Sequence, residues 1–581
     1  MRKISFWTYV ILLLSLATAC KKNSFLAATV STNLDSTTVF QDSTKAIQFL
    51  NAIYLNIGFA SDPKRFTSGS DIAGLESACD EAEGPNLSAS NGFTMFATGT
   101  VNPTIVPTDA WGTPYTEIRA CNQYLTHLYE IPFNAALKSE TEGEARFLRA
   151  WYYFIMLEHY GGIPLIGDSI FSGADPVNIP RSSFSACVTY ISNECDAAAT
   201  LLPVNQSGSN YGRASGGAAL ALKSRLLLYA ASPLFQGGGF AGSAAGGLDS
   251  IVAYPDQNPN RWVLAAAAAQ AVINLGQFSL NVDSAAGEPG DGFMSVFLLR
   301  PNSEYILAHM FDPGNKYLEE CWDAPSRGGS GGPHPYQELV DAYPMSNGLA
   351  ISDPNSGYDP TRPYLNRDPR LYYTVMHDST IRPRWEQQPA PVSIALNADY
   401  NPPINISQDA VFTGTPTGYY INKMLDTSVT WYGLSGSYRC LPLIRYAEIL
   451  LNYAEATNES VGPTQDVYGA VQAVRQRAGL SPFTLPTGLS QTDMRTAIQL
   501  ERQLELAYEG HRFFDVRRWK IANQTETLLM HGMEVLKSST APTTYTEFTV
   551  RQHVFSNAMY LWPLPLGEIA KSPKLLQNPL Y

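Results

Sequence analysis

Apolar residues recur at helical spacing in several long stretches of the chain, and the stretches tend to follow one another in pairs. In residues 140–162 the apolar side chains that share one helical face are Ala145, Leu148, Trp151, Tyr152 and Ile155. Gly161 and Gly162 close this pattern, so the helix is expected to end there. The other stretches with a helical pattern are residues 113–131, 185–202, 216–235, 260–276, 443–460 and 466–480. Helix pairs of this length, rich in Ala and Gly, are typical of tetratricopeptide-like packing, although no strict period is present.

The pattern changes between about residues 280 and 440, where segments full of Pro, Gly, Asn and Asp replace the helical periodicity. Long irregular segments of this kind are usually functional or disordered. Their many aromatic residues favour ordered loops here. We therefore expect a mainly α fold with helix pairs, long irregular loops and a few short strands.

The amino terminus has the layout of a secretory signal. Residues 1–19 contain a short basic start and an apolar run that is too short to span a bilayer comfortably, and Cys20 follows directly. The boundary is similar to a bacterial lipobox, with Ala17 where Leu is more usual. We expect cleavage and a lipid anchor on Cys20, followed by a Ser- and Thr-rich tether over residues 20–45. The alternative is a secreted protein with a coincidental Cys.

Charge and cysteine content narrow the classes of function. The formal net charge of −13 opposes binding to a phosphate backbone, so nucleic acid is not expected as a partner. Cys187 and Cys195 lie on one predicted helix, roughly 12 Å apart along its axis, too far for a disulfide bond. The cysteines after Cys20 are expected to be buried thiols. The histidines show no ligand spacing, so we expect no metal and no cofactor.

The strongest chemical pattern lies in residues 501–519, "ERQLELAYEGHRFFDVRRW". Glu501, Glu505 and Glu509 recur every four residues, which places them along one face of a continuous helix. Paired carboxylates could serve as the general acid and base of a glycoside hydrolase. The interpretation we favour is a partly buried ion network that orients helices. Its further members are Arg512, Asp515, Arg517 and Arg518.

Six stretches of the chain carry a resemblance to one known family; they are residues 144–166, 221–234, 443–456, 474–480, 501–519 and 560–581. Together they resemble the SusD/RagB outer-membrane lipoproteins. They follow the family's order over essentially the whole chain. The sequence departs from the family at Leu580, where many members carry Gly, and at Lys21, Lys22 and Asn23, where acidic residues are common.

The resemblance implies a fold, a cellular location and a binding partner. It implies a helical SusD-like part at residues 46–240 and a second part at residues 241–581, with ligand-binding loops at about 280–440 and helices at 441–520. It also implies a non-catalytic protein, lipid-anchored on the outer face of the outer membrane. Such a protein would bind oligosaccharides and cap a SusC-like TonB-dependent transporter. The alternatives are a peptide-binding member of the family, a secreted glycoside hydrolase and a structural helical-repeat adaptor.

Aromatic residues in loops suit sugar binding, because a pyranose presents an apolar face to a ring and hydroxyls to polar neighbours. The first expected cluster is Tyr317, Trp322, Asp323 and Arg327, and the second is Asn91, Phe93 and Phe96. Trp111, Trp385 and Trp431 are further candidates. Each ring could instead pin its loop to the body of the protein. The tryptophans on helical patterns or beside a proline, expected in the core, are Trp151, Trp262, Trp519 and Trp562.

Overall fold

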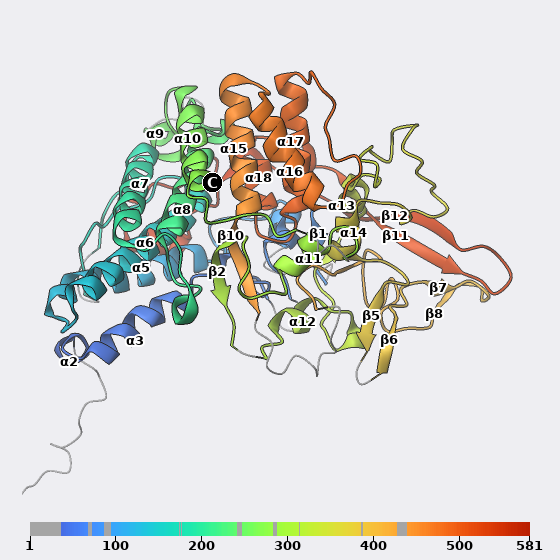
Figure 1. The fold of residues 1–581 in the computed structure, drawn as a ribbon, viewed down its shortest axis with the longest axis horizontal. Coiled ribbons are helices and arrows are strands. Elements are labelled where there is room, and N and C mark those ends of the chain that lie inside the picture. The colour runs from blue at the N-terminus through green and yellow to red at the C-terminus, as the bar shows by residue number, and fades with distance from the viewer. Residues whose placement is uncertain are drawn as a thin grey trace, which may run out of the picture.

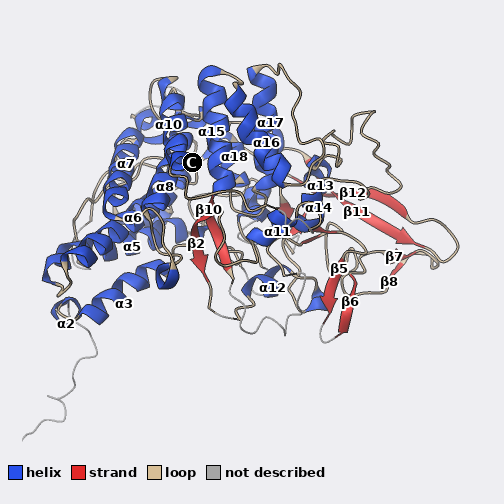
Figure 2. Cartoon of the chain, viewed as in Figure 1, coloured by secondary structure: helices blue, strands red, loops and turns tan. Residues whose placement is uncertain are grey.

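The computed structural model describes residues 36–67, 72–85, 94–172, 175, 177–240, 247–282, 287–312, 314–384, 387–426 and 439–581. The expected signal, Cys20 and most of the tether lie outside these residues. Helices make up 45% of the structure and strands 11%, so the predicted mainly α fold is confirmed. Figure 2 shows the helices gathered on one side of the molecule and most strands on the other.

The long helices pack in chain order, each against the next, and form one continuous layer (Figure 1). They are α3 (Ser43–Tyr54), α5 (Asp109–His127), α6 (Ala135–Tyr160), α7 (Phe184–Leu201), α8 (Gly216–Ala231), α10 (Asn260–Asn274), α15 (Tyr446–Val461), α16 (Gln465–Arg477) and α17 (Gln491–Glu505). Polar side chains begin several of them; Asn134, for example, accepts a hydrogen bond from the backbone N–H of Leu137. Gly161, with φ of 78°, ends α6 at the predicted position.

Short helices connect and flank this layer. They are α2 (Ser36–Phe40), α4 (Thr94–Ala97), α9 (Leu248–Val252), α11 (Asp291–Val296), α12 (Tyr317–Trp322), α13 (Gln337–Ala342), α14 (Pro369–Thr374), α18 (Arg512–Arg518), α19 (Ala522–Thr525) and α20 (Leu566–Lys571). Within the described residues, none of the helices is both long enough and apolar enough to cross a membrane.

The strands form small sheets beside the helical layer. They are β1 (Ala82–Glu83), β2 (Tyr305–Met310), β3 (His334–Pro335), β4 (Val375–Met376), β5 (Ile381–Arg384), β6 (Gln387–Pro391), β7 (Leu396–Asn397), β8 (Ile404–Asn405), β9 (Tyr420–Ile421), β10 (Cys440–Arg445), β11 (Leu529–Lys537) and β12 (Thr544–Gln552). The four-stranded sheet has the order β12-β11-β7-β8, with β11 and β12 antiparallel and β11 and β7 parallel. The long edge strand of this sheet is β12.

The continuous helix expected over residues 501–519 is not present. α17 ends at Glu505, a turn follows, and α18 begins at Arg512. Tyr508 and Gly510 in the turn have φ values of 60° and 77°, which a right-handed helix does not accommodate. Glu509 therefore lies on the turn and not on a face shared with Glu501 and Glu505.

Two large apolar clusters hold the fold together. One runs through the helical layer and includes Trp151 and Trp562, and the other underlies the loop-rich region and includes Trp322. Trp519 is also buried, while Trp262 is half-buried beside a small cluster. The six cysteines after Cys20 are free and buried, as expected; they are Cys79, Cys121, Cys187, Cys195, Cys321 and Cys440.

Candidate functional site

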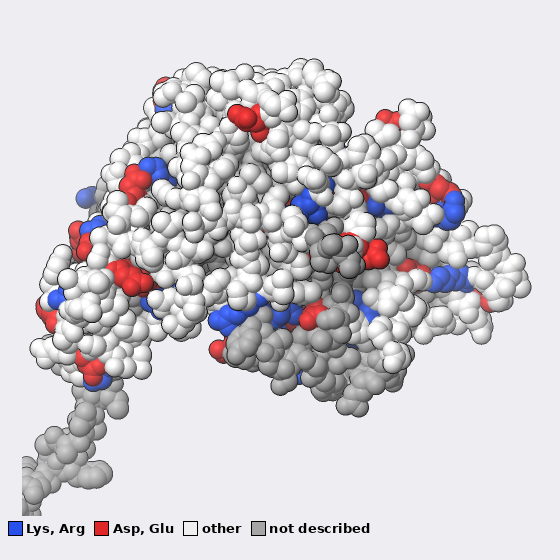
Figure 3. All heavy atoms as spheres, in the orientation of Figure 1, with Lys and Arg blue, Asp and Glu red and all other residues white. Residues whose placement is uncertain are grey.

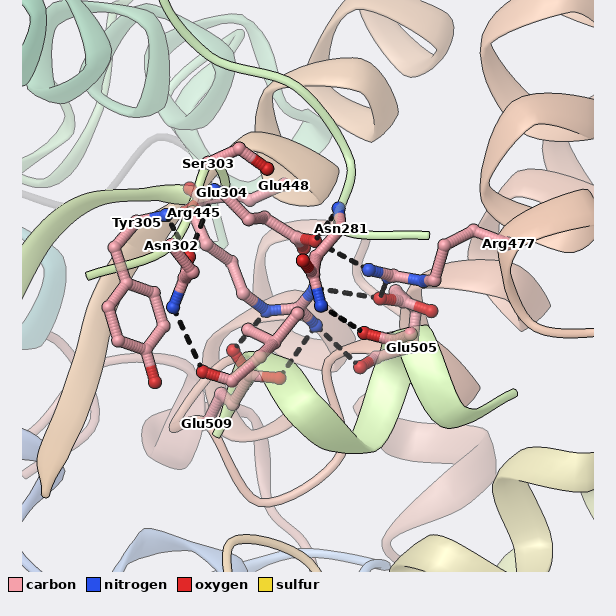
Figure 4. Close-up of polar contacts among 12 residues, drawn as sticks. Asn281, Asn302, Ser303, Glu304, Tyr305, Arg445, Glu448, Arg477, Glu505 and Glu509 are labelled. Atoms are coloured by element: carbon pink, nitrogen blue, oxygen red, sulfur yellow. Dashed lines mark hydrogen bonds and ion pairs between the residues drawn. The ribbon is translucent and has the colours of Figure 1, made fainter. Parts of the chain in front are cut away.

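The charged residues of the 501–519 stretch meet cations from distant parts of the chain in a buried network (Figure 4). Arg445 lies at its centre and donates to Glu304 at 2.6 Å, to Glu505 at 2.7 Å and to both carboxylate oxygens of Glu509 at 2.7 Å. Arg477 donates to Glu304 at 2.5 Å and also bonds Glu505. All five side chains are buried, so each charge is balanced by a neighbour instead of by water.

Two further cations extend the network. Arg370 donates to Glu501 at 2.6 Å and to Glu505 at 3.0 Å. Lys423 donates to Glu509 at 2.7 Å, and burial lowers the pKa of its ammonium group to about 8 although the carboxylate opposes the shift. Strand β10, which provides Arg445, and helices α14, α16 and α17 are thereby joined through charged side chains.

The charged residues in the carboxyl-terminal half of the 501–519 stretch form ion pairs outside the network around Arg445. Arg512 binds Asp80 through two bonds of 2.6 and 2.8 Å, and Asp515 accepts from Arg518 at 2.7 Å and from Arg502 at 3.1 Å. Arg517 instead donates to the backbone carbonyl oxygens of Phe513 and Met559. Its guanidinium also stacks on the Phe513 ring at 3.5 Å from the ring centroid.

The protonation states of these glutamates do not suit acid catalysis. Burial by itself would raise the pKa of Glu505, but the guanidinium groups of Arg477, Arg445 and Arg370 outweigh it and lower that pKa well below the usual range. Burial is outweighed in the same way at Glu509, where Arg445 and Lys423 lower the pKa to about 2. A general acid needs a raised pKa to hold its proton at neutral pH. Both groups are ionised and closed to substrate, so the arrangement supports a structural role.

The expected ligand cluster around Trp322 is corrected by the structure. Trp322 is 2% exposed and packs in the second apolar cluster, so neither face of its ring can meet a ligand. Asp323 is buried and accepts from Arg382 at 2.7 Å. Arg327 is buried and donates to the backbone carbonyl oxygens of Ala390 and Pro391. Asp323 and Arg327 fasten the loop after α12 to the β5–β6 hairpin.

The other candidates divide between the core and the undescribed residues. Phe96 is buried, with its ring centroid 5.0 Å from that of Trp562 and 5.4 Å from that of Phe513, so it is a core residue. Trp111 is buried and is one of the residues that line a mostly apolar cavity of about 340 Å³ between α5 and α20. The candidates that lie outside the described residues are Asn91, Phe93, Trp385 and Trp431.

Among the candidates that the structure describes, Tyr317 alone stays half-exposed, and it belongs to a small mixed cluster. Its hydroxyl donates to Asp62, and the ammonium group of Lys64 lies 4.5 Å from its ring centroid. The Phe311 ring lies 5.8 Å from Tyr317, tilted by 56°. Burial and the Asp62 carboxylate raise the pKa of Tyr317, so the phenol stays neutral. We call these four residues, Asp62, Lys64, Phe311 and Tyr317, the Tyr317 platform.

The platform presents the chemistry that a sugar needs: aromatic surface beside a cation and a carboxylate. Sequence reasoning missed three of its members. Asp62 begins a turn, accepting from the backbone N–H of Lys64 at 2.7 Å, and its Asp-Pro dipeptide is a turn signal visible in the sequence. No local pattern shows that this turn meets α12, because 255 residues separate Asp62 from Tyr317.

Charged residues of both signs are scattered over the face shown in Figure 3, which resembles an ordinary solvated surface.

Comparison with known families gives two matches along the chain. The profile described as "SusD family" matches residues 283–581, and the profile described as "Starch-binding associating with outer membrane" matches residues 28–228. SusD-like protein P2 of Formosa agariphila is 32% identical over 151 residues, which make up 25% of this chain and 26% of that protein. SusD-like protein P25 of the same organism is 32% identical over 141 residues, 23% of each chain. The chain thus matches about a quarter of the length of these relatives.

Solved structures match over nearly the whole chain. A SusD-like protein from Bacteroides fragilis is 26% identical, with a TM-score of 0.74 over 94% of this chain and 98% of its own. A laminarin-binding SusD-like protein has a TM-score of 0.60 at 22% identity, over 93% of this chain and 100% of its own. The second likeness concerns the fold alone.

Proposed function

Because this chain belongs to the SusD family, we propose that it binds oligosaccharides at the cell surface and delivers them to a SusC-like TonB-dependent transporter. The family profile covers more than half of the chain, and the description of the amino-terminal match names starch binding and the outer membrane. The Tyr317 platform is the described surface that supports a sugar ligand best, because it joins a half-exposed ring to charged hydrogen-bonding groups.

The proposed role is that of a binding protein and not of an enzyme. The strongest candidates for a catalytic acid and base are buried and paired with Arg or Lys; they are Glu501, Glu505 and Glu509. A glycoside hydrolase needs two carboxyl groups that reach one sugar, of which one holds a proton. The buried ion network supports neither requirement.

The proposed anchor is a lipid on Cys20, which would hold the protein on the outer membrane, facing outward. The layout of the amino terminus supports this proposal, and α2 begins at Ser36, sixteen residues after Cys20. An extended chain of that length reaches roughly 50 Å, enough to hold the folded part clear of a bilayer. Cys20→Ala is expected to leave a folded protein that no longer fractionates with membranes. Retention of that variant in the outer membrane at the wild-type level would contradict the anchor.

The platform is tested by affinity electrophoresis of the purified protein in gels containing soluble starch, laminarin and other polysaccharides. We expect wild-type protein to be retarded by at least one of them, without release of reducing sugar. Tyr317→Ala is expected to weaken that retardation, by roughly ten- to a hundredfold in dissociation constant, because one stacking ring is lost. Tyr317→Phe keeps the ring and should bind more tightly than Tyr317→Ala.

The matched control is Tyr129→Ala, which removes an exposed tyrosine outside the platform and should leave retardation unchanged. Equal retardation of Tyr317→Ala and wild type would remove the platform from the proposal. Release of reducing sugar by the wild type would instead favour a hydrolase. Binding of oligopeptides in place of every polysaccharide would indicate a peptide-binding member of the family.

A further inference from the structure

A second aromatic surface lies at the edge of the four-stranded sheet. A cavity of about 380 Å³ opens between edge strand β12 and the loop after β8, with Pro85 at its border. The described residues that line it are uncharged and include two phenylalanines, Phe412 and Phe548, and several threonines. It shares no lining residue with the Tyr317 platform. A concave, uncharged and partly aromatic surface favours a neutral ligand.

Phe412 is held in an unusual position for a large apolar side chain. Its side chain is 59% exposed, and its backbone φ is 66°, in the left-handed region that bulky residues rarely adopt. A tight turn maintains this geometry: the N–H of Phe412 donates to the carbonyl oxygen of Thr415 at 2.9 Å. Burial does not account for the ring, and the backbone conformation opposes it. Residues kept in such conformations are concentrated at binding sites.

The second ring is positioned by a glycine. The centroid of Phe548 lies 4.8 Å from that of Phe412, with the rings tilted by 60°, so the two form a corner. On the neighbouring strand, a Cβ added to Gly532 would lie 2.8 Å from the Phe548 ring, so a larger residue there would displace the ring. The corner is thus built from a strained turn and from a strand position that tolerates only glycine.

Polar groups border the corner. The Thr413 hydroxyl oxygen accepts from the Asn405 side chain at 2.5 Å, which leaves its own proton available to a ligand. Thr549 is exposed and lines the same cavity. Hydroxyl groups beside aromatic rings match the alternation of C–H faces and O–H edges on a sugar.

We propose that this cavity is a second carbohydrate site, in which a sugar ring stacks on Phe412 and its hydroxyls bond Thr413 and Thr549. The proposal rests on the proposed function, since it assigns the same class of ligand to a second place. Two separated sites on one protein would raise its apparent affinity for long chains over short ones, because the second contact becomes intramolecular.

The test uses calorimetry with a heptasaccharide cut from a polysaccharide that retards the wild type. Wild-type protein is expected to bind two molecules. Phe412→Gly removes the ring and also relieves the backbone at positive φ, so it should fold at least as well as the wild type. We expect it to bind one heptasaccharide molecule and to lose at least tenfold in apparent affinity for the parent polysaccharide. Phe412→Tyr, which keeps a ring, should retain both sites.

The control is Tyr400→Ala, which removes another exposed aromatic residue from outside the cavity and should change nothing. Unchanged stoichiometry and affinity in Phe412→Gly, while Tyr317→Ala weakens binding, would overturn the second site and leave the proposed function standing. Failure of the wild type to bind any polysaccharide would overturn the proposed function and the second site with it.

Discussion

Arg445 bonds Glu505 twice: its Nη1 donates to the carboxylate and its Nη2 to the backbone carbonyl oxygen, each at 2.7 Å. The second bond satisfies a carbonyl in the last turn of α17, which has no partner within its own helix. One side chain therefore balances the charge of the helix end and fixes the point where the chain turns towards Glu509.

Glu505→Ala is expected to lower the free energy of unfolding by on the order of 3 kcal/mol, because Arg445, Arg477 and Arg370 would lose a buried counter-charge. The measurement is urea unfolding at pH 7. The control is Asp196→Ala, which breaks an exposed pair with Lys223 and should cost less than about 1 kcal/mol. Equal costs for the two variants would contradict the buried network.

Acid is expected to destabilise the protein through the same groups. Burial alone would raise the pKa values of Glu505, Glu509 and Asp515, but neighbouring Arg and Lys side chains outweigh it and lower all three in the folded state. The pKa of Glu509 falls to about 2. Their stabilisation is complete above the ordinary carboxyl pKa near 4.5 and is lost as pH falls towards 2, because the unfolded chain takes up protons first. Urea midpoints at pH 6, 4.5 and 3 should fall in that order. A midpoint that stays constant over this range would contradict the prediction.

The contribution of Glu76 to stability should depend on pH in the opposite direction. Burial raises its pKa to about 7, and its Oε1 has no hydrogen-bond partner among the described residues. The folded state then holds the proton more tightly than the unfolded state, so its contribution is lost as pH rises from about 4.5 to 7. Glu76→Gln is expected to raise the free energy of unfolding by roughly 3 kcal/mol at pH 8 and to change it little at pH 4. A similar effect at both pH values would show that ionisation is not the cause.

The positions of α5, α6, α7, α8, α10, α15 and α16 could be predicted because their apolar faces follow a local rule. Gly161, for instance, ends α6 where the pattern stops. The turn at Tyr508 could not be predicted, since no local sequence signal marks a tyrosine with positive φ. Contacts made by the neighbouring residues impose that conformation. The periodic spacing of Glu501, Glu505 and Glu509 picked out charges that act together, but not their cations. Glu505 and Glu509 share Arg445 on strand β10, and Glu501 and Glu505 share Arg370 on α14.

The ligand candidates show where local reasoning ends. Trp322 and Tyr317 lie on the same short helix, and one is buried while the other is half-exposed. Trp322 packs within the second apolar cluster, whose members come from distant parts of the chain, and Tyr317 packs against the edge of that cluster. The sequence did not mark Phe412 as a candidate. Its surroundings depend on Phe548 of strand β12, which is distant in the sequence.

The pairing of Arg512 with Asp80 has a consequence for biosynthesis. The two residues are 432 positions apart, so an early segment waits for its buried counter-charge until nearly the whole chain has been made. A chain interrupted before residue 512 would leave a buried aspartate without its cation, a defect that quality-control proteases can detect as local opening. Completion of the region around Asp80 therefore depends on residues made near the end of synthesis.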